Sequence, residues 1–414
     1  MDIIWGLGFG NWCFPERSEG VMLSWIGFII SLIVILIVAR KNLPLALLCG
    51  AIILGLFTLP LVSILDEIIH TFTDLSIIFL ALAMGVIPMI GGVMKASGQM
   101  DDLVNNLRIG RKGLMALSPA IMGLLPMPGG ALLSAPILEK GGEGVADDLK
   151  SVINNWFRHL FVMIYPLSSA LIASAKISNL NLYTAALSLL PVFAFALFLG
   201  YIFFIRKVHG NIIYSSSFSL KKLLIPLCII LIAPFLDFIL KKIFAFHVKE
   251  IATLIGVSTA FILSWRLSRT KLNLKEISKK MKPWNFSLII LGMFIFLHIF
   301  QSSNVADLIA SIPLPPATLC VVAGFILGFA TGRVLLPASI ILPVYLATSA
   351  ISPFAFAIIY TSIFFGYIIS PVHPCVCVTI EYFNVPLKKF FKLLAAPTFI
   401  IFVITLLISI FIMT

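Results

Sequence analysis

The chain has 414 residues, of which 60% are hydrophobic and 11% are charged, and its mean hydropathy is +1.12. This composition excludes a soluble domain of any size and indicates a protein whose solvent is the lipid bilayer. The net charge of +12 does not indicate nucleic-acid binding, because the basic residues cluster in short loops beside apolar segments, without interleaved aromatic residues. The apolar segments are continuous rather than alternating, which excludes a closed β-barrel.

The first half contains several segments long enough to cross the membrane as helices, which takes about 20 residues each. Residues 1–21 lack the pattern of a signal peptide, so we interpret them as an extracellular tail or the product of a misassigned start before Met22. Spans are expected at 22–39, 43–64, 75–96, 152–175 and 183–205, with an amphipathic segment at 65–74 and a short polar helix at 99–107.

Two of the apolar segments in this half are interrupted. Residues 114–140 are broken at 126–130 by prolines and glycines. Each part is too short to cross the bilayer, so we expect a re-entrant hairpin there. The span at 152–175 is broken at Tyr165–Pro166.

A polar linker at 206–220 is followed by a second half with the same plan. Its spans are expected at 222–240, 248–265, 284–301, 354–380 and 391–413, with a short polar segment at 304–311. A second hairpin at 315–347 is broken at 330–333, and the span at 354–380 is broken at 370–374. The sequence therefore predicts an all-α polytopic membrane protein of about ten transmembrane helices and two re-entrant hairpins.

The two halves resemble each other at an offset of about 205 residues. Residues 96–104 resemble 301–309, residues 129–137 resemble 332–340, and residues 165–169 lie opposite 370–374. Matching Gly/Pro-interrupted segments in two halves of a membrane protein indicate a transport site. We expect repeat 1 at 22–205 and repeat 2 at 221–414. Each repeat has an odd number of crossings, so the second is inverted relative to the first.

The placement of basic residues predicts the orientation. If Arg40–Lys41 is cytoplasmic, the external side receives only Arg17, Lys176, Lys241, Lys242 and Lys249 of the 29 Lys and Arg. Apart from Arg333, which lies inside the membrane, all the others are then cytoplasmic, as the positive-inside rule requires. The chain is therefore expected in the cell membrane with both termini external, and with its two hairpins opening to opposite sides.

The breaks are the expected binding site. Non-helical backbone survives at membrane depth only where protein or a water-filled cavity satisfies its polar groups. Four breaks in matching positions would meet near the midplane, where the free N–H groups of half-helices attract an anion. The alternative is that the prolines and glycines are ordinary kinks. The candidate substrate-binding residues are Pro128, Gly129, Gly130, Ser134, Arg158, Ser168, Ser169, Thr331, Gly332, Arg333, Ser339 and His373.

The most specific predictions concern three of these side chains. Arg333 lies deep in an apolar hairpin and offers a bidentate fork to a carboxylate or phosphate, although a structural ion pair would also explain it. Arg158 is either a second anion contact or a residue that reaches the cytoplasmic interface. His373 is a substrate hydrogen-bond donor, a proton carrier or a histidine satisfied within a helix gap.

Coupling to sodium is favoured over coupling through an acidic residue. No carboxylate falls at the expected midplane, since Asp237 and Glu381 lie towards span ends. Oxygens near Ser134, Ser168, Thr331 and Ser370 are candidate ligands for Na⁺. No other cofactor is expected.

The residues around the first hairpin resemble a known family. The run Leu125-Pro126-Met127-Pro128-Gly129-Gly130-Ala131-Leu132-Leu133-Ser134-Ala135-Pro136, followed by Ile153-Asn154-Asn155-Trp156-Phe157-Arg158-His159, is similar to the domain of unknown function 401 family of the ion transporter superfamily. The resemblance covers residues 22 to 414. It implies paired scaffold helices, two hairpins and two broken helices in an inverted repeat, with the substrate near the hairpin tips and an elevator motion in many members. The Ser-Asn-Thr tip motif of the dicarboxylate/sodium branch is absent from both hairpins.

The leading functional prediction is a secondary active transporter of a small anion, an organic carboxylate first of all, coupled to Na⁺ or H⁺. A nucleotide-driven pump is disfavoured because the chain lacks a Gly-Lys-Ser/Thr phosphate loop. The alternatives are an anion channel and an intramembrane enzyme that uses His159, His373 and Glu381; we expect the chain not to be an enzyme. A homodimer through the unbroken scaffold helices is expected.

Overall fold

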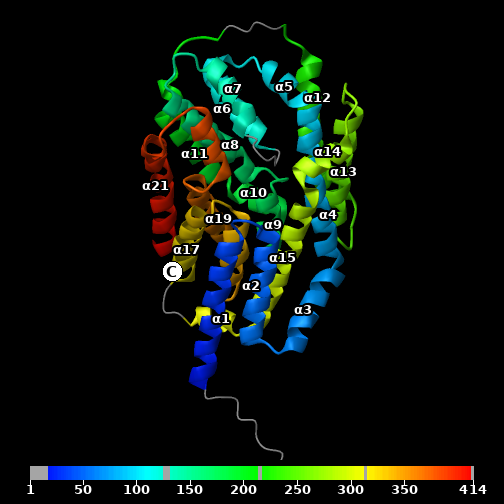
Figure 1. The fold of residues 1–414 in the computed structure, drawn as a ribbon, viewed down its shortest axis with the longest axis vertical. Helices are drawn as coiled ribbons and strands as arrows, with labels where there is room; N and C mark the ends of the chain where they lie inside the picture. The colour runs from blue at the N-terminus through cyan, green and yellow to red at the C-terminus, as the bar shows by residue number, and fades with distance from the viewer. Residues whose placement is uncertain (1–16, 125–130, 213–216, 312–314, 412–414) are drawn as a thin grey trace, which may run out of the picture.

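The structure is a computed structural model that describes residues 17–124, 131–212, 217–311 and 315–411. These parts are helical, with short connections and no strand among them (Figure 1). The first half contains α1 (Arg17–Val38), α2 (Leu43–Thr58), α3 (Leu61–Thr73), α4 (Leu75–Ala96), α5 (Gln99–Asn105), α6 (Gly110–Gly123), α7 (Ala131–Gly141), α8 (Asp147–Ile164), α9 (Ser169–Ile177), α10 (Leu182–Ser188), α11 (Leu190–Phe203) and the 3₁₀ turn η1 (Ile205–Lys207).

The second half repeats this order of long, short and broken helices. It contains α12 (Leu220–Ile243), α13 (Glu250–Arg266), α14 (Leu274–Met281), α15 (Pro283–Ser302), α16 (Val305–Ala310), α17 (Pro316–Thr331), α18 (Leu335–Leu346), α19 (Pro353–Ile368), α20 (Pro374–Tyr382) and α21 (Leu387–Phe411).

Several of these helices have the length and composition of membrane spans. In the described part of the chain six helices qualify, and the pair α8 and α9, bent by 41° at its break, would make a seventh. The helices α2, α17, α18 and α19 are apolar but shorter. The expectation of a multi-pass α-helical membrane protein is confirmed, whereas the number of about ten full crossings stays a prediction.

Two expected spans are divided. The segment expected as one span at 43–64 ends at Thr58, and α3 begins at Leu61. Pro60 is the cause: it lacks a backbone N–H and forces Leu59 into an extended conformation, with φ of −133° and ψ of 152°. The segment expected at 183–205 is interrupted at Leu189, just before Pro191 enters the first turn of α11.

The packing of the first half recurs in the second. Helix α1 packs on α2 as α12 packs on α13, and α6 packs on α8 as α17 packs on α19. Contacts between the halves are also paired: α4 contacts α13 as α15 contacts α2, and α9 contacts α18 as α20 contacts α7.

Two glycines fix the close approach of the hairpin helices. A Cβ on Gly123 would collide with the carbonyl oxygen of Arg158, and a Cβ on Gly328 with that of Ile363. Both glycines, and both carbonyls, are separated by the offset that relates the sequence repeats. The two hairpins therefore meet their broken helices in the same register.

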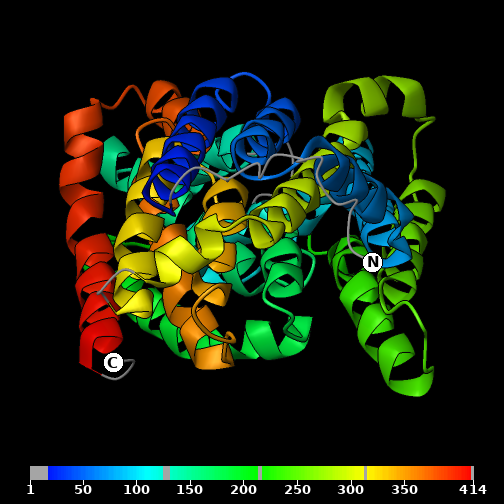
Figure 2. The same cartoon turned by 90° about the horizontal axis from the view of Figure 1, so that it is seen from below.

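The elements that surround the breaks come from opposite ends of the molecule. Helices α6 and α7 lie at the same end as α5 and the start of α12, whereas α17 extends towards the end where α2 meets α3 (Figure 1). Seen along the long axis, α21 lies at one edge and α12 to α14 lie at the opposite edge (Figure 2).

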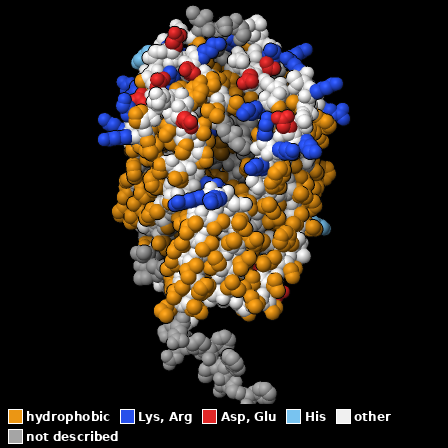
Figure 3. Space-filling view, in the orientation of Figure 1, with side chains coloured by type: hydrophobic (Ala, Val, Ile, Leu, Met, Phe, Trp, Pro, Cys, Tyr) orange, Lys and Arg blue, Asp and Glu red, His pale blue; other side chains and the backbone are white. Residues whose placement is uncertain are grey.

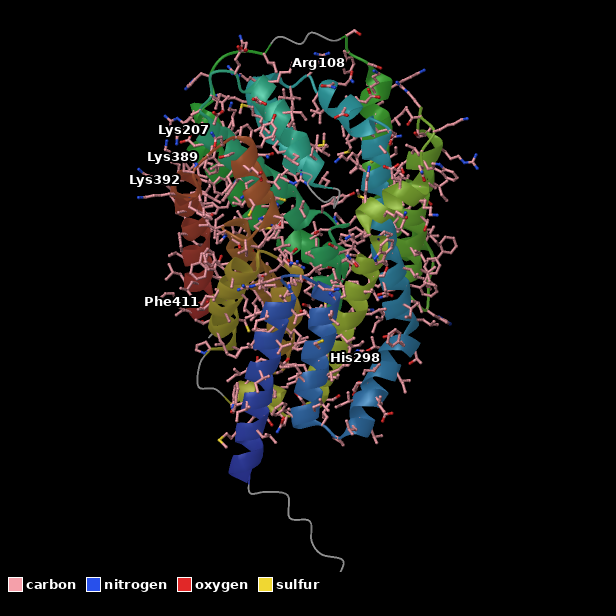
Figure 4. All side chains as sticks on the ribbon, in the orientation of Figure 1. Arg108, Lys207, His298, Lys389, Lys392 and Phe411 are labelled. Carbon is pink, nitrogen blue, oxygen red and sulfur yellow. The ribbon has the colours of Figure 1, made fainter. Side chains whose placement is uncertain are left out.

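Charged side chains gather at the end where α5 to α7 lie, and hydrophobic side chains cover most of the remaining visible surface (Figure 3). Arg108, Lys207, Lys389 and Lys392 all lie towards this charged end, whereas His298 and Phe411 lie nearer the other (Figure 4).

Candidate functional site

A cluster of buried polar side chains lies where α8 passes the break between α19 and α20. Arg158, His159 and His373 are 4%, 3% and 2% exposed. The rings of His159 and His373 have centroids 4.6 Å apart, and the ring of Tyr367 lies 4.1 Å from that of His373. We call Arg158, His159, Tyr367 and His373 the central cluster.

The local sequence explains why His373 faces this cluster. Helix α19 ends at Ile368 because the following Ser370–Pro371 bond cannot continue a helix, and α20 restarts with Pro374 at its first position. His373 is the N-cap of α20, with an extended backbone at φ of −69° and ψ of 120°. The break therefore places an imidazole, and not an apolar side chain, beside Arg158.

Several polar atoms around the cluster lack a partner. Nη1 of Arg158, Nδ1 of His373 and Oδ1 of Asn155 are buried without a hydrogen-bond partner among the described residues. The side-chain nitrogen of Asn155 donates to the carbonyl of Ile368 at 3.1 Å, which ties α8 to the break. Buried polar groups are nearly always hydrogen-bonded in native proteins, so unpaired groups of this kind mark a candidate binding site.

The second hairpin reaches the same break. Gly332 ends α17 in the left-handed conformation, with φ of 59°, and a Cβ there would lie 2.8 Å from the backbone nitrogen of His373. Thr331 uses its hydroxyl to donate to the carbonyl of Leu327 at 2.7 Å. Arg333 follows and is half-buried. The structure therefore brings the tip of the second hairpin to His373.

The first hairpin is tied to α8 and α20 by a second polar group. The Ser134 hydroxyl donates to Oδ1 of Asn154 at 2.6 Å, and Nδ2 of Asn154 donates to the hydroxyl of Thr379 at 3.2 Å. All three side chains are fully buried. Pro128, Gly129 and Gly130, which were expected at the tip of this hairpin, lie outside the described residues.

The remaining serines among the candidate substrate and sodium ligands make separate contacts. Ser168 faces the hydroxyl of Tyr360, and Ser370 accepts from the backbone nitrogen of Val372 at 3.3 Å. Ser339 donates to the carbonyl of Leu336 at 2.8 Å, and Ser169 is a half-buried residue at the start of α9. Apart from that between Ser168 and Tyr360, each of these contacts is local to its own segment, and sodium coordination by these oxygens stays a prediction.

Two residues of the central cluster, together with the adjoining Cys375, are also possible metal ligands. Each of His159, His373 and Cys375 offers one ligand atom, and these three atoms lie within 4.8 Å of one another. The guanidinium of Arg158 adjoins both imidazoles and opposes the binding of a cation there. Glu381, the third residue of the enzyme alternative, is exposed. The arrangement suits an anion better than a metal ion.

Sequence reasoning named Arg158 and His373 as binding residues and His159 only under the enzyme alternative, and it gave no role to Asn154, Asn155, Tyr367 or Thr379. His159, Asn155 and Tyr367 surround the unpaired groups, and Asn154 with Thr379 ties the hairpin. The polar pair Asn154-Asn155, one turn before Arg158-His159 in an expected membrane span, was the available signal.

A second polar region lies between α9–α10 and α12–α13. Nζ of Lys176 binds a carboxylate oxygen of Glu250 at 2.7 Å, and the Tyr183 hydroxyl donates to Asp237 at 2.6 Å. Lys241 also pairs with the buried Asp237, at 2.7 Å. A cavity of about 230 Å³ borders this region.

Together, the helical architecture and the buried polar centre define a polytopic α-helical membrane protein with a polar site between broken helices. Residues 22–413 match the family described as "Protein of unknown function (DUF401)", and the chain belongs to that family. The family expected from the hairpin motif is therefore confirmed. No protein of curated function matches the chain.

Proposed function

We propose that this protein is a secondary active transporter of a small anion, with Arg158 at the centre of the binding site. The observation that carries the proposal is the unpaired guanidinium nitrogen of Arg158, buried beside two histidines where a hairpin tip meets a helix break. A buried guanidinium nitrogen without a hydrogen-bond partner is costly, and a bound anion would reduce that cost.

The chemistry of the cluster favours a carboxylate. Arginine presents planar parallel donors that match the two oxygens of a carboxylate. His373 and the hydroxyl of Tyr367 supply neighbouring groups that hydrogen-bond a second oxygen or a hydroxyl of the substrate. Arg333 at the adjoining hairpin tip would supply a further positive charge as the hairpin closes.

The paired packing supports an inverted repeat related to the ion transporter superfamily. Hairpin helices that approach one break from opposite ends would act as alternating gates, one for each side. The charged end marked by Arg108 and Lys207 would face the cytoplasm, so the N- and C-termini of the chain would both lie on the external side of the membrane. Coupling to Na⁺ or H⁺ and a homodimer through α1, α2, α12 and α13 complete the proposal.

Anion binding to the purified protein tests this proposal. Thermal unfolding in detergent is followed with a panel of carboxylates, phosphate and sulfate, each in Na⁺ and in K⁺, because a ligand that binds the native state raises the melting temperature. The charge-assisted bonds lost in Arg158→Gln are worth about 1.5–3 kcal/mol, so affinity for the stabilising anion should fall at least about tenfold. Arg206→Gln, at an exposed basic position, is the matched control.

Two further measurements separate the alternatives. Arg158→Lys keeps the charge but loses the fork, so it should fold and bind with intermediate affinity. Proteoliposomes should exchange labelled anion without a macroscopic conductance. A channel would produce such a conductance. Wild-type affinity in Arg158→Gln would assign this arginine a structural role.

A further inference from the structure

A second group of chemically active side chains lies far from the central cluster, where α3 packs against α15. Glu67 and His70 are on α3, and His298 is on α15. One ligand atom of each lies within 4.8 Å of the other two, and the two imidazole rings have centroids 4.7 Å apart. His298 lies away from the charged end of the molecule (Figure 4).

The amphipathic character of α3 explains the grouping. Glu67 and His70 are three residues apart, so they lie on the same face of the helix. His298 is brought to this face from the other half of the chain, because α15 packs along both α2 and α3. The group therefore forms only when the two halves are assembled.

Hydrogen bonds around His298 fix which ring nitrogen is free. The Thr71 hydroxyl donates to the carbonyl of Glu67 at 2.9 Å, so its oxygen is left to accept from Nδ1–H of His298, also at 2.9 Å. The other nitrogen, Nε2, then carries the lone pair. A metal-binding histidine is typically oriented in this way, with its second nitrogen donating to a protein oxygen.

Glu67 is held in a similar manner. The Ser302 hydroxyl donates to Oε1 of Glu67, and Oε2 faces Nδ1 of His70 at 3.8 Å. That separation is too long for a hydrogen bond, so the carboxylate and the imidazole face each other without a bond between these atoms. The side chain of His70 is 62% exposed and is free to turn.

We propose that Glu67, His70 and His298 form a binding site for a divalent transition-metal ion of the Zn²⁺ type. Two imidazoles and one carboxylate are a ligand set that zinc accepts, with water in the fourth position. Bonds of about 2.0–2.2 Å to each ligand require the three atoms to move closer together than they are here. A rotation of the exposed His70 supplies that movement. The bound ion would join α3 to α15, and thus the two halves of the chain, at the end that we propose to be external.

Zinc binding by the tag-free, full-length protein tests the site. Isothermal titration with ZnSO₄ should show one saturable site per chain, and Co²⁺ should give the visible spectrum of a tetrahedral site. His70→Ala and Glu67→Gln should each abolish that site. Thr71→Val keeps all three ligands but removes the oxygen that orients His298, so affinity should fall about 10- to 100-fold.

Matched variants exclude other sources of binding. His247→Ala removes an exposed histidine outside the group and should leave the titration unchanged. Cys375→Ala removes a possible metal ligand beside the central cluster and should also leave the titration unchanged. The proposal is wrong if zinc binding is absent, if it survives both His70→Ala and Glu67→Gln in folded protein, or if it is lost only in Cys375→Ala.

Discussion

At the residue scale, the candidate site is asymmetric. Gly123 meets the carbonyl of Arg158 as Gly328 meets that of Ile363, so Arg158 and Ile363 would occupy equivalent positions in the proposed inverted repeat. Ile363 is fully buried and apolar. Only one of the two equivalent positions therefore carries a charge. A strictly symmetric site would hold a cation at both positions, whereas here only the first half supplies one.

Asn154 is the residue on which the position of the first hairpin depends, since it bonds both Ser134 and Thr379. We expect Asn154→Ala to lower the melting temperature markedly, because leaving a buried partner unsatisfied costs about 1–3 kcal/mol. Asn211→Ala, at an exposed position, is the control. In a double-mutant cycle with Ser134→Ala the two changes should be non-additive. Additive effects would show that the Ser134–Asn154 bond contributes nothing.

At the element scale, local chemistry made the breaks predictable. The interruptions near Pro166, Gly332 and Pro371 were expected from sequence and are present, because proline removes a helical N–H and disfavours a helical residue before it, and a left-handed glycine is a common helix end. Helix α14 was not predicted from the sequence, because its basic residues are typical of a cytoplasmic loop. In the structure Asn273 caps this helix and one of its faces is buried. The helix boundary at Leu59 was missed because the apolar run continues through it.

The site could be predicted only in part, for a physical reason. Arg158 and His373 were each recognisable as polar residues near a break. Their neighbours were not, because His159 and His373 are more than 200 residues apart and meet only after the halves pack. Arg333 lies between α17 and α18, where a hairpin tip was expected, and its contact with an anion stays a prediction. Nothing local to Arg158 reveals that its Nη1 is buried without a hydrogen-bond partner among the described residues.

The glycine contacts between hairpins and broken helices give a prediction at this scale. Gly123→Ala and Gly328→Ala should each destabilise the protein, because the new methyl group forces α6 from α8, or α17 from α19, at a typical cost of about 1–3 kcal/mol. Thermal unfolding measures the effect. Gly20→Ala, whose Cβ would meet nothing within 4 Å, should match the wild type. Equal melting temperatures for all four proteins would contradict the close approach.

At the scale of the whole molecule, the polar contacts of α9 with α13 bear on the proposed transport cycle. The hairpins and broken helices α6–α9 and α17–α20 form the proposed mobile bundle, and α1, α2, α12 and α13 form the proposed scaffold. The ion pair between Lys176 and Glu250 crosses from one to the other. A bundle that moves as a body must break this pair in each cycle, whereas gating by the hairpin tips alone leaves it intact.

Cross-linking across this boundary distinguishes the two mechanisms. Cysteines at Lys176 and Glu250, joined by a short bifunctional thiol reagent after the exposed Cys228 and Cys377 are replaced by serine, should stop anion exchange while the protein keeps its melting temperature. The control pair replaces Glu276 and Lys280, which contact each other at 2.7 Å on the exposed surface of α14, and should leave exchange unchanged when joined. Full exchange with α9 fixed to α13 would mean that the bundle does not move against the scaffold. Access would then alternate by opening of the hairpins alone, and the asymmetric position of Arg158 would have to serve both sides of the membrane without being displaced.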